Sequence, residues 1–262
     1  MPVTEATPTP SVGTPEGLLA EVCDALDAEL VALDVEGWST PVLHDNTVRD
    51  LIIHLTVVND ALVERLRGTV AAPLTRPEAR DATKVARDKL HDPSPEDTLD
   101  AWRRSVEHLR ECAGSAASVC WVGSTLTASE AVVERAVETW IVANDIRNAI
   151  GRASLDPSAQ HLRVMCDVAV QLLSLALASS DCPHAGTLHV SLTGPGGGEW
   201  EIPLGDDPSA ASFSLSAAAR DLCLLFGQRI DPLDFAYTAR GDDDAAAVAR
   251  ALVDAARACD RW

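Results

Sequence analysis

The stretch TVRDLIIHL, residues 47–55, predicts the central feature of the fold. Thr47 and Asp50 form a T-x-x-D pair, a weaker version of the capping box that begins a helix. Apolar residues then recur every three or four positions as far as Gly68, which is the spacing of one buried helix face. A helix is therefore expected from Thr47, with His54 in its middle among apolar neighbours.

Similar signals on both sides of this stretch predict a helical first half. Thr14 and Ser94 each precede a proline, which suits the first turn of a helix. Thr127 and Glu130 form a full capping box, and the helix that they begin is expected to stop at Gly151. The remaining segments are predicted as a helix over 158–178, a short helix over 82–90 and a connection of small residues over 114–124.

The pattern changes after Cys182. Residues 187–193 (TLHVSLT) and 199–204 (EWEIPL) alternate with period two, and the glycine-rich stretch 194–198 between them is typical of a hairpin turn. We expect a flexible arm over 1–13, a helical domain over 14–181 and a small α+β domain over 182–262. The other C-terminal predictions are strands over 211–215 and 235–239 and helices over 216–226 and 244–259.

The composition excludes some classes of function. The chain has 262 residues and a formal net charge of −19, so phosphate backbones and anionic lipid surfaces would repel it. No apolar run approaches the roughly 20 residues that span a bilayer, and the first residues lack the features of a secretion signal. The seven cysteines show no C-x-x-C spacing, which favours reduced thiols, several of them in the core. We therefore expect a cytoplasmic protein with neither nucleic acid nor membrane as a partner.

Two side chains on the predicted helices could carry chemistry. His54 lies on a mostly apolar face, where a histidine is more often a satisfied core residue than a ligand. Glu138 lies within ERAVETWIVANDIRNAIG, residues 134–151, and a buried carboxylate needs a partner or a metal. Arg135 and Asp145 can share its helix face. Glu138 is thus either half of a surface pair with Arg135 or a metal-binding or active-site carboxylate, and spacing leaves both interpretations open.

The order of several short motifs resembles a known family. Trp38 and TVRDLIIHL, followed by ERAVETWIVANDIRNAIG, are similar to the mycothiol-dependent maleylpyruvate isomerase family, part of the DinB-like helical superfamily. Glu199-Trp200, SAAARDLCLLFGQR (216–229) and ARGDDDAAAVARALV (239–253) look like that family's small C-terminal domain. The resemblance implies an α+β fold class, with an N-terminal DinB-like four-helix bundle and a sterol-carrier-like C-terminal domain.

The resemblance also implies a metal site, from which this chain departs. The family binds a divalent metal, usually zinc, through two histidines and a glutamate, and the metal activates the thiol of mycothiol. His54 matches the first histidine and Glu138 the glutamate. The second histidine would fall four residues after the glutamate, where this chain has Val142. Because a catalytic zinc takes three protein ligands, we favour a site without tightly bound zinc, and mycothiol is the implied cosubstrate.

Other residues could complete or adjust this site. Asp145 could replace the missing ligand, although it lies two helical turns beyond Glu138. His44 or His161 could approach from elsewhere in the chain.

Two charged residues have implied roles beside the ligands. Asp50, one turn before His54, could orient the imidazole, or it could simply supply charge at the helix N-terminus. Arg229 matches an arginine that in the family faces the inter-domain cleft and binds anionic groups, and a guanidinium suits a carboxylate. The alternative is a surface arginine that follows a helix.

Two classes of function follow from the sequence. The first is a thiol-dependent transferase or isomerase in which His54 and Glu138 polarise or deprotonate mycothiol, while Arg229 holds a carboxylate of a small acceptor metabolite. The second is a metal-free binding protein, or a metal-independent enzyme of secondary metabolism, that kept the scaffold. Val142 favours the second class.

Overall fold

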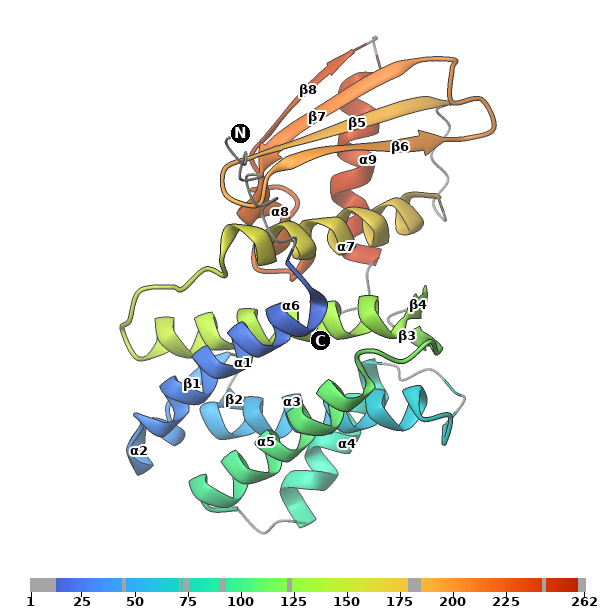
Figure 1. Ribbon diagram of the computed structural model, residues 1–262. Helices are drawn as coiled ribbons and strands as arrows, with labels where there is room; N and C mark the ends of the chain where they lie inside the picture. Colours follow the sequence, from blue (N-terminus) through green and yellow to red (C-terminus); the bar gives the residue numbers. More distant parts are fainter. Residues whose placement is uncertain are drawn as a thin grey trace, which may run out of the picture.

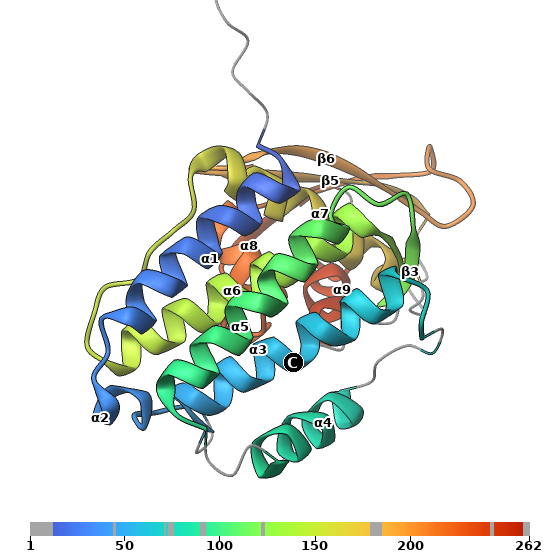
Figure 2. The ribbon, with the colours of Figure 1, turned by 60° about the horizontal axis from the view of Figure 1, so that its bottom comes forward.

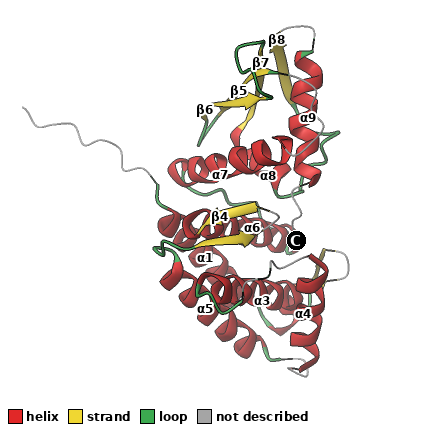
Figure 3. Ribbon diagram, turned by 90° about the vertical axis from the view of Figure 1, so that its right-hand side faces the viewer, coloured by secondary structure: helices red, strands yellow, loops and turns green. Residues whose placement is uncertain are grey.

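A computed structural model describes residues 13–43, 46–70, 72, 76–89, 93–121, 124–178, 185–241 and 244–258. Helices dominate one part of the molecule, and a sheet backed by helices forms the other (Figure 1 and Figure 3). The predicted boundary between 181 and 182 lies outside the described residues, as does most of the predicted arm over 1–13.

The long helices α1, α3, α5 and α6 pack side by side in the helical part, and α4 lies on the outer flank of α3 (Figure 2). Two short hairpins, β1–β2 and β3–β4, precede α3 and α6. The elements of this part are α1 (Pro15–Val31), α2 (Val35–Trp38), β1 (Pro41–Leu43), β2 (Asn46–Thr47), α3 (Val48–Leu66), α4 (Arg76–Lys89), α5 (Pro95–Cys112), β3 (Ser118–Trp121), β4 (Ser124–Thr127) and α6 (Ala128–Ala149).

The predicted helix starts are confirmed. The Thr14 side chain caps α1, and reciprocal capping boxes join Thr47 to Asp50 at α3 and Thr127 to Glu130 at α6. Each box satisfies N–H groups that a helix start leaves without partners. These short polar signals therefore determine where the two central helices begin.

Two segments of the helical part differ from the prediction. The segment 114–124, expected as a connection, contains β3, which pairs with β4 and buries Val119 and Trp121. The alternation there covers only four residues, which is too short to stand out in the sequence. The helix expected over 82–90 is α4, which begins at Arg76, because Pro77 lies in its first turn, where proline is tolerated.

A charged cluster lies in the core of the helical part. Glu134 and Arg135, both on α6, are fully buried. Arg135 Nε donates to Asn59 Oδ1 on α3 at 3.1 Å, and Trp121 Nε1 donates to Glu134 Oε2 at 2.8 Å. Arg135 Nη1 lies 3.9 Å from Glu134 Oε2. The interpretation of Arg135 as half of a surface pair with Glu138 is therefore wrong.

The second part is a four-stranded sheet with strand order β6-β5-β7-β8. β5 and β6 form the predicted antiparallel hairpin, β7 runs parallel to β5, and β8 pairs antiparallel with β7. Helices α7 and α9 pack against this sheet. The elements are α7 (Ala159–Ala178), β5 (Gly186–Thr193), β6 (Gly198–Leu204), β7 (Ser212–Ala218), α8 (Ala219–Phe226), β8 (Tyr237–Gly241) and α9 (Ala245–Ala258).

The C-terminal boundaries shift slightly from their predicted positions. Residues 216–218, expected as helix, extend β7, because they pair with residues 191–193 of β5. The helix therefore starts at Ala219, and the fourth strand begins at Tyr237, two residues later than expected. The last predicted helix is α9, and Cys259 lies outside the described residues.

Helix α7 joins the two parts. It contacts α8 and α9 as well as α6 and α1. By length and mean hydropathy it could cross a bilayer, but His161, Arg163 and Asp167 interrupt it, so it is not a continuous apolar run. Half of this stretch is buried inside the protein, and helices in protein cores reach a similar length and hydropathy.

Candidate functional site

His54 lies in the middle of α3 and faces α4. Its side chain is partly buried, and its Nδ1 atom lies 3.0 Å from the Thr83 hydroxyl oxygen on α4. Asp50 accepts hydrogen bonds from the backbone and hydroxyl of Thr47 and pairs with Arg87 of α4 at 3.2 Å. Burial raises the pKa of the Asp50 carboxyl, but these hydrogen bonds outweigh it and hold that pKa below its ordinary value. Asp50 is thus part of the helix start, and its role in orienting His54 stays a prediction.

Thr83 is the contact that the sequence analysis missed. It belongs to α4 and lies within the short helix predicted over 82–90. Its hydroxyl also donates to the Ala79 carbonyl oxygen at 2.7 Å. A threonine one turn after a small buried residue gives no signal by itself, because its partner histidine lies on another helix.

Asp145 and Arg229 come together where the C-terminal part meets α6, the helix that also carries Glu138. Arg229 follows α8 and makes a two-pronged ion pair with Asp145, with Nε and Nη2 at 2.9 and 2.7 Å from Oδ2. Its Nη1 donates to the Gly227 carbonyl oxygen at 3.0 Å. Burial lowers the pKa of the Arg229 guanidinium, but Asp145 and then Glu138 raise it above its usual range, which places the Glu138 carboxylate near this cation.

Gly227 lets the loop after α8 reach α6. A Cβ atom at Gly227 would lie 2.0 Å from Cδ1 of Ile141, so a larger residue would push that side chain aside. The close approach brings Arg229 within reach of Asp145. The interpretation of Arg229 as a plain surface arginine is wrong, because the pair is only 21% and 15% exposed.

His54 lies on α3 and Glu138 lies on α6, and these two helices contact each other. The last turn of α3 lies at the β3–β4 hairpin that leads into α6, so α6 runs back antiparallel to α3 (Figure 1). The Asn59–Arg135 hydrogen bond marks where the helices face each other. His54 lies five residues before Asn59 and Glu138 three residues after Arg135. Both are therefore displaced in the same direction along the helices, by about 7 and 5 Å of helix rise.

The side chains that the structure describes do not fit the zinc that the resemblance implies. Among the described residues, no three His, Cys, Asp or Glu side chains are grouped so that they could hold a metal ion. Val142 is buried beside Glu138 in α6 and offers no lone pair. His161 contacts the Glu21 carboxylate where α7 meets α1, and His44 lies outside the described residues.

The described cysteines divide by burial. Cys23, Cys112, Cys166 and Cys223 are buried and form no disulfide, as the sequence predicted for several of them, and Cys120 is exposed. Burial raises the pKa of the Cys23 thiol to about 12, which keeps it protonated.

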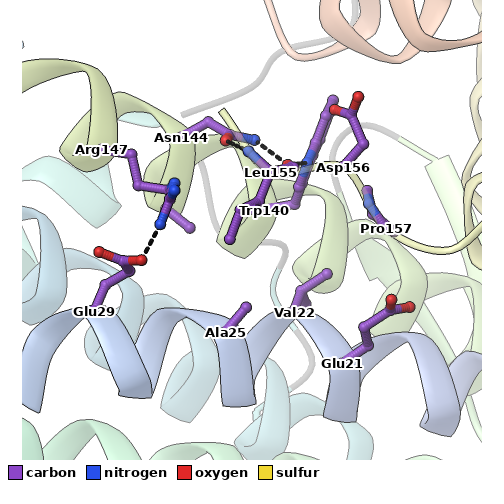
Figure 4. Close-up of a pocket in the computed structure, with 11 residues that line it drawn as sticks. Glu21, Val22, Ala25, Glu29, Trp140, Asn144, Arg147, Leu155, Asp156 and Pro157 are labelled. Atoms are coloured by element: carbon purple, nitrogen blue, oxygen red, sulfur yellow. Dashed lines mark hydrogen bonds and ion pairs between the residues drawn. The ribbon is translucent and has the colours of Figure 1, made fainter. Parts of the chain in front are cut away.

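A cavity of about 180 Å³ lies on another side of α6, between α6 and α1 (Figure 4). Trp140 Nε1 and Asn144 Nδ2 both donate to the Leu155 carbonyl oxygen, so these polar groups hold the cavity wall together. Arg147 is likewise ion-paired with Glu29. The described lining of this cavity includes none of the predicted site residues, so we do not assign it to the same site.

Comparison with known proteins gives one family match. Residues 19–147 match the model of the mycothiol maleylpyruvate isomerase N-terminal domain. The chain is 27% identical over 215 residues to the uncharacterized protein Rv0036c of Mycobacterium tuberculosis, covering 79% of this chain and 81% of that protein.

Solved structures agree on the fold. A crystal structure of the mycothiol-dependent maleylpyruvate isomerase aligns with a TM-score of 0.56 at 16% identity, over 82% of this chain and 88% of that one. A histidine variant of that enzyme aligns with a TM-score of 0.57 at 16% identity, over 86% and 91% of the two chains.

Proposed function

Because the helical part of this chain belongs to the family of mycothiol maleylpyruvate isomerase N-terminal domains, we propose that the protein is a mycothiol-dependent transferase or isomerase. Its substrate is a small metabolite that bears a carboxylate. The observation that carries the proposal is that a partly buried imidazole on α3 and a buried carboxylate on α6 lie at neighbouring levels of two adjacent helices.

The proposed chemistry is thiol activation by His54. A free thiol has a pKa of about 8.5, so only a small fraction is thiolate at neutral pH. An imidazole within reach of the thiol accepts its proton and makes the nucleophile available. Glu138 then stabilises the imidazolium that results, because a carboxylate favours a nearby positive charge. No step of this chemistry uses a metal.

Arg229 has a more restricted role than the sequence suggested. Asp145 binds the Nε and Nη2 atoms of its guanidinium, and Nη1 donates to the Gly227 carbonyl oxygen. One N–H on each of Nη1 and Nη2 is left by these three bonds, since the guanidinium has five donors. We propose that a substrate carboxylate binds end-on to these two N–H groups, with Asp145 holding the guanidinium in place.

The finer features of the fold belong to the same proposal. We propose that α1, α3, α5 and α6 are the family's four-helix bundle and that β5–β8 with α8 and α9 form its sterol-carrier-like domain. The predicted division into helical and α+β domains, and a cytoplasmic location in which thiols stay reduced, go with this assignment.

The alternative function is a metal-free binding protein. Val142 favours it, because a buried valine stands where the family's second histidine belongs. In that case the protein would bind a thiol or a metabolite near His54, Glu138 and Arg229 without activating it. A metal-independent enzyme of secondary metabolism lies between these two proposals.

Mycothiol binding tests the proposal. A ligand present at 100 times its Kd stabilises the folded protein by about 2.7 kcal/mol, so mycothiol should raise the melting temperature by several degrees. The bound thiol should ionise well below pH 8.5, as read from the ultraviolet absorbance of its thiolate. His54→Gln should bind mycothiol but not lower the pKa of its thiol. Binding without any such lowering in the unmodified protein would favour the binding protein. No binding would remove the mycothiol-dependent enzyme and leave only a protein that acts on or binds a different metabolite.

Val142→His tests the geometry of the site from the other direction. The new imidazole would lie one turn from Glu138 and supply the third protein ligand that a catalytic zinc takes. We expect zinc affinity to rise at least tenfold over the unmodified protein, as measured by competition with a chelating dye. The control Val142→Met adds similar bulk without a nitrogen ligand and should show no gain. If Val142→His matches this control, His54 and Glu138 do not point to a common position.

A further inference from the structure

The contact between His54 and Thr83 determines more than the position of the imidazole ring. His54 Nδ1 lies 3.0 Å from Thr83 Oγ1, within hydrogen-bond distance. Either atom could donate in such a contact, since a neutral imidazole has one N–H and one bare nitrogen. The second bond of the threonine hydroxyl decides between the two arrangements.

That second bond commits the only hydroxyl proton of Thr83. Thr83 Oγ1 lies 2.7 Å from the Ala79 carbonyl oxygen, which is buried in the first half of α4 and can only accept. The hydroxyl proton therefore points along α4 to Ala79, and the lone pairs of Oγ1 face His54. A bare Nδ1 would place two acceptors 3.0 Å apart with no proton between them.

We propose that Thr83 is a positioning residue that holds the neutral His54 imidazole in the Nδ1–H tautomer, with the lone pair on Nε2. The neutral ring then accepts a proton at Nε2. This inference deepens the proposed function, on which its role in catalysis rests, because it names the atom that receives the thiol proton. The assignment of the tautomer rests on the two hydrogen bonds of Thr83 and not on the proposed function.

The rest of the α3–α4 interface keeps Thr83 in register with His54. Asp50 and Arg87 pair one turn away from the His54–Thr83 contact on both helices, at 3.2 Å. Both contacts therefore follow the same edge along which α4 packs on α3. Ala79 is fully buried, which holds the acceptor of the Thr83 hydroxyl in place.

Nitrogen NMR of the ligand-free protein measures the tautomer directly. Long-range proton–nitrogen spectra distinguish a protonated from a bare imidazole nitrogen, and His54→Gln identifies the His54 signals by their loss. At a pH where the ring is neutral, we expect Nδ1 to be the protonated nitrogen in the majority of molecules. A majority of the Nε2–H form in the unmodified protein would overturn the proposal.

Three variants separate the role of Thr83 from general effects on the helices. Thr83→Val removes the acceptor at nearly constant volume and should shift the majority to the Nε2–H form, whereas Thr83→Ser should keep the Nδ1–H form. Thr56→Val is the matched control, because the Thr56 hydroxyl makes the same bond to a carbonyl four residues earlier, that of Ile52. It should leave the His54 signals unchanged.

Each outcome of these spectra bears on the tautomer and not on the substrate. An unchanged tautomer in Thr83→Val, with helix content preserved by circular dichroism, would overturn the assignment to Thr83. The measurement needs no mycothiol, so a failure of mycothiol to bind would remove the proposed function and leave the tautomer result standing.

Discussion

Arg135→Ala is expected to lower the free energy of unfolding by about 3–5 kcal/mol, because it removes one member of the buried Glu134–Arg135 charge pair. Both side chains are fully buried in the helical part. The change also removes the donor to Asn59 Oδ1 and leaves a cavity on α6. Urea unfolding followed by the fluorescence of the nearby Trp121 measures the loss.

A surface arginine supplies the control for this change. Arg103 pairs with Asp27 at 2.6 Å, but the two side chains are 44% and 32% exposed. Arg103→Ala should therefore cost at most about 1 kcal/mol. The double variant Arg135→Met with Glu134→Gln removes both buried charges and should recover most of the lost stability. If Arg135→Ala were as mild as Arg103→Ala, the guanidinium would have to reach water.

Arg229→Met is expected to lower the free energy of unfolding by about 2–4 kcal/mol, the usual cost of breaking a largely buried, hydrogen-bonded charge pair. Asp145, whose side chain is only 15% exposed, would lose both hydrogen bonds from the Arg229 guanidinium. Asp145→Asn removes the charge on the other side. In a double-mutant cycle the two changes should together cost less than their sum by more than 1 kcal/mol, roughly the coupling that close charge pairs show.

A second ion pair, which joins the same two parts of the chain at the surface, supplies the matched control. Arg220 on α8 pairs with Asp156 before α7 at 2.7 Å, and these side chains are 36% and 44% exposed. Arg220→Met should cost no more than about 1 kcal/mol and should show little coupling with Asp156→Asn. Equal costs at the two pairs would mean that the Arg229 pair is no better shielded from water than the Arg220 pair.

The parts of the fold that local signals control could be predicted from the sequence. The capping residues Thr14, Thr47 and Thr127 begin their helices where expected, because a cap acts within one turn of itself. The hairpin of β5 and β6 was equally clear from its alternation. β3 and β4 were missed because four alternating residues do not distinguish a strand from a loop.

The arrangement of the site depended on contacts between elements far apart in the chain. Asp145 and Arg229 were each singled out, yet nothing local shows that they bind each other across 84 positions. Thr83 could not be recognised because its importance comes from His54 on another helix. Arg135 was placed near Glu138 by its spacing, whereas burial of its whole side chain directs it to Asn59.

Because α7 packs against α6 and α1 as well as α8 and α9, its side chains contribute to the packing of both parts. A truncated protein that ended after α7 would expose to water the apolar face of α7 that packs on α8 and α9, and such exposed apolar surface promotes aggregation. A gene that began at β5 would deprive the sheet of much of its backing. Recombination between related genes could therefore exchange loops on either part more readily than it could exchange the parts themselves.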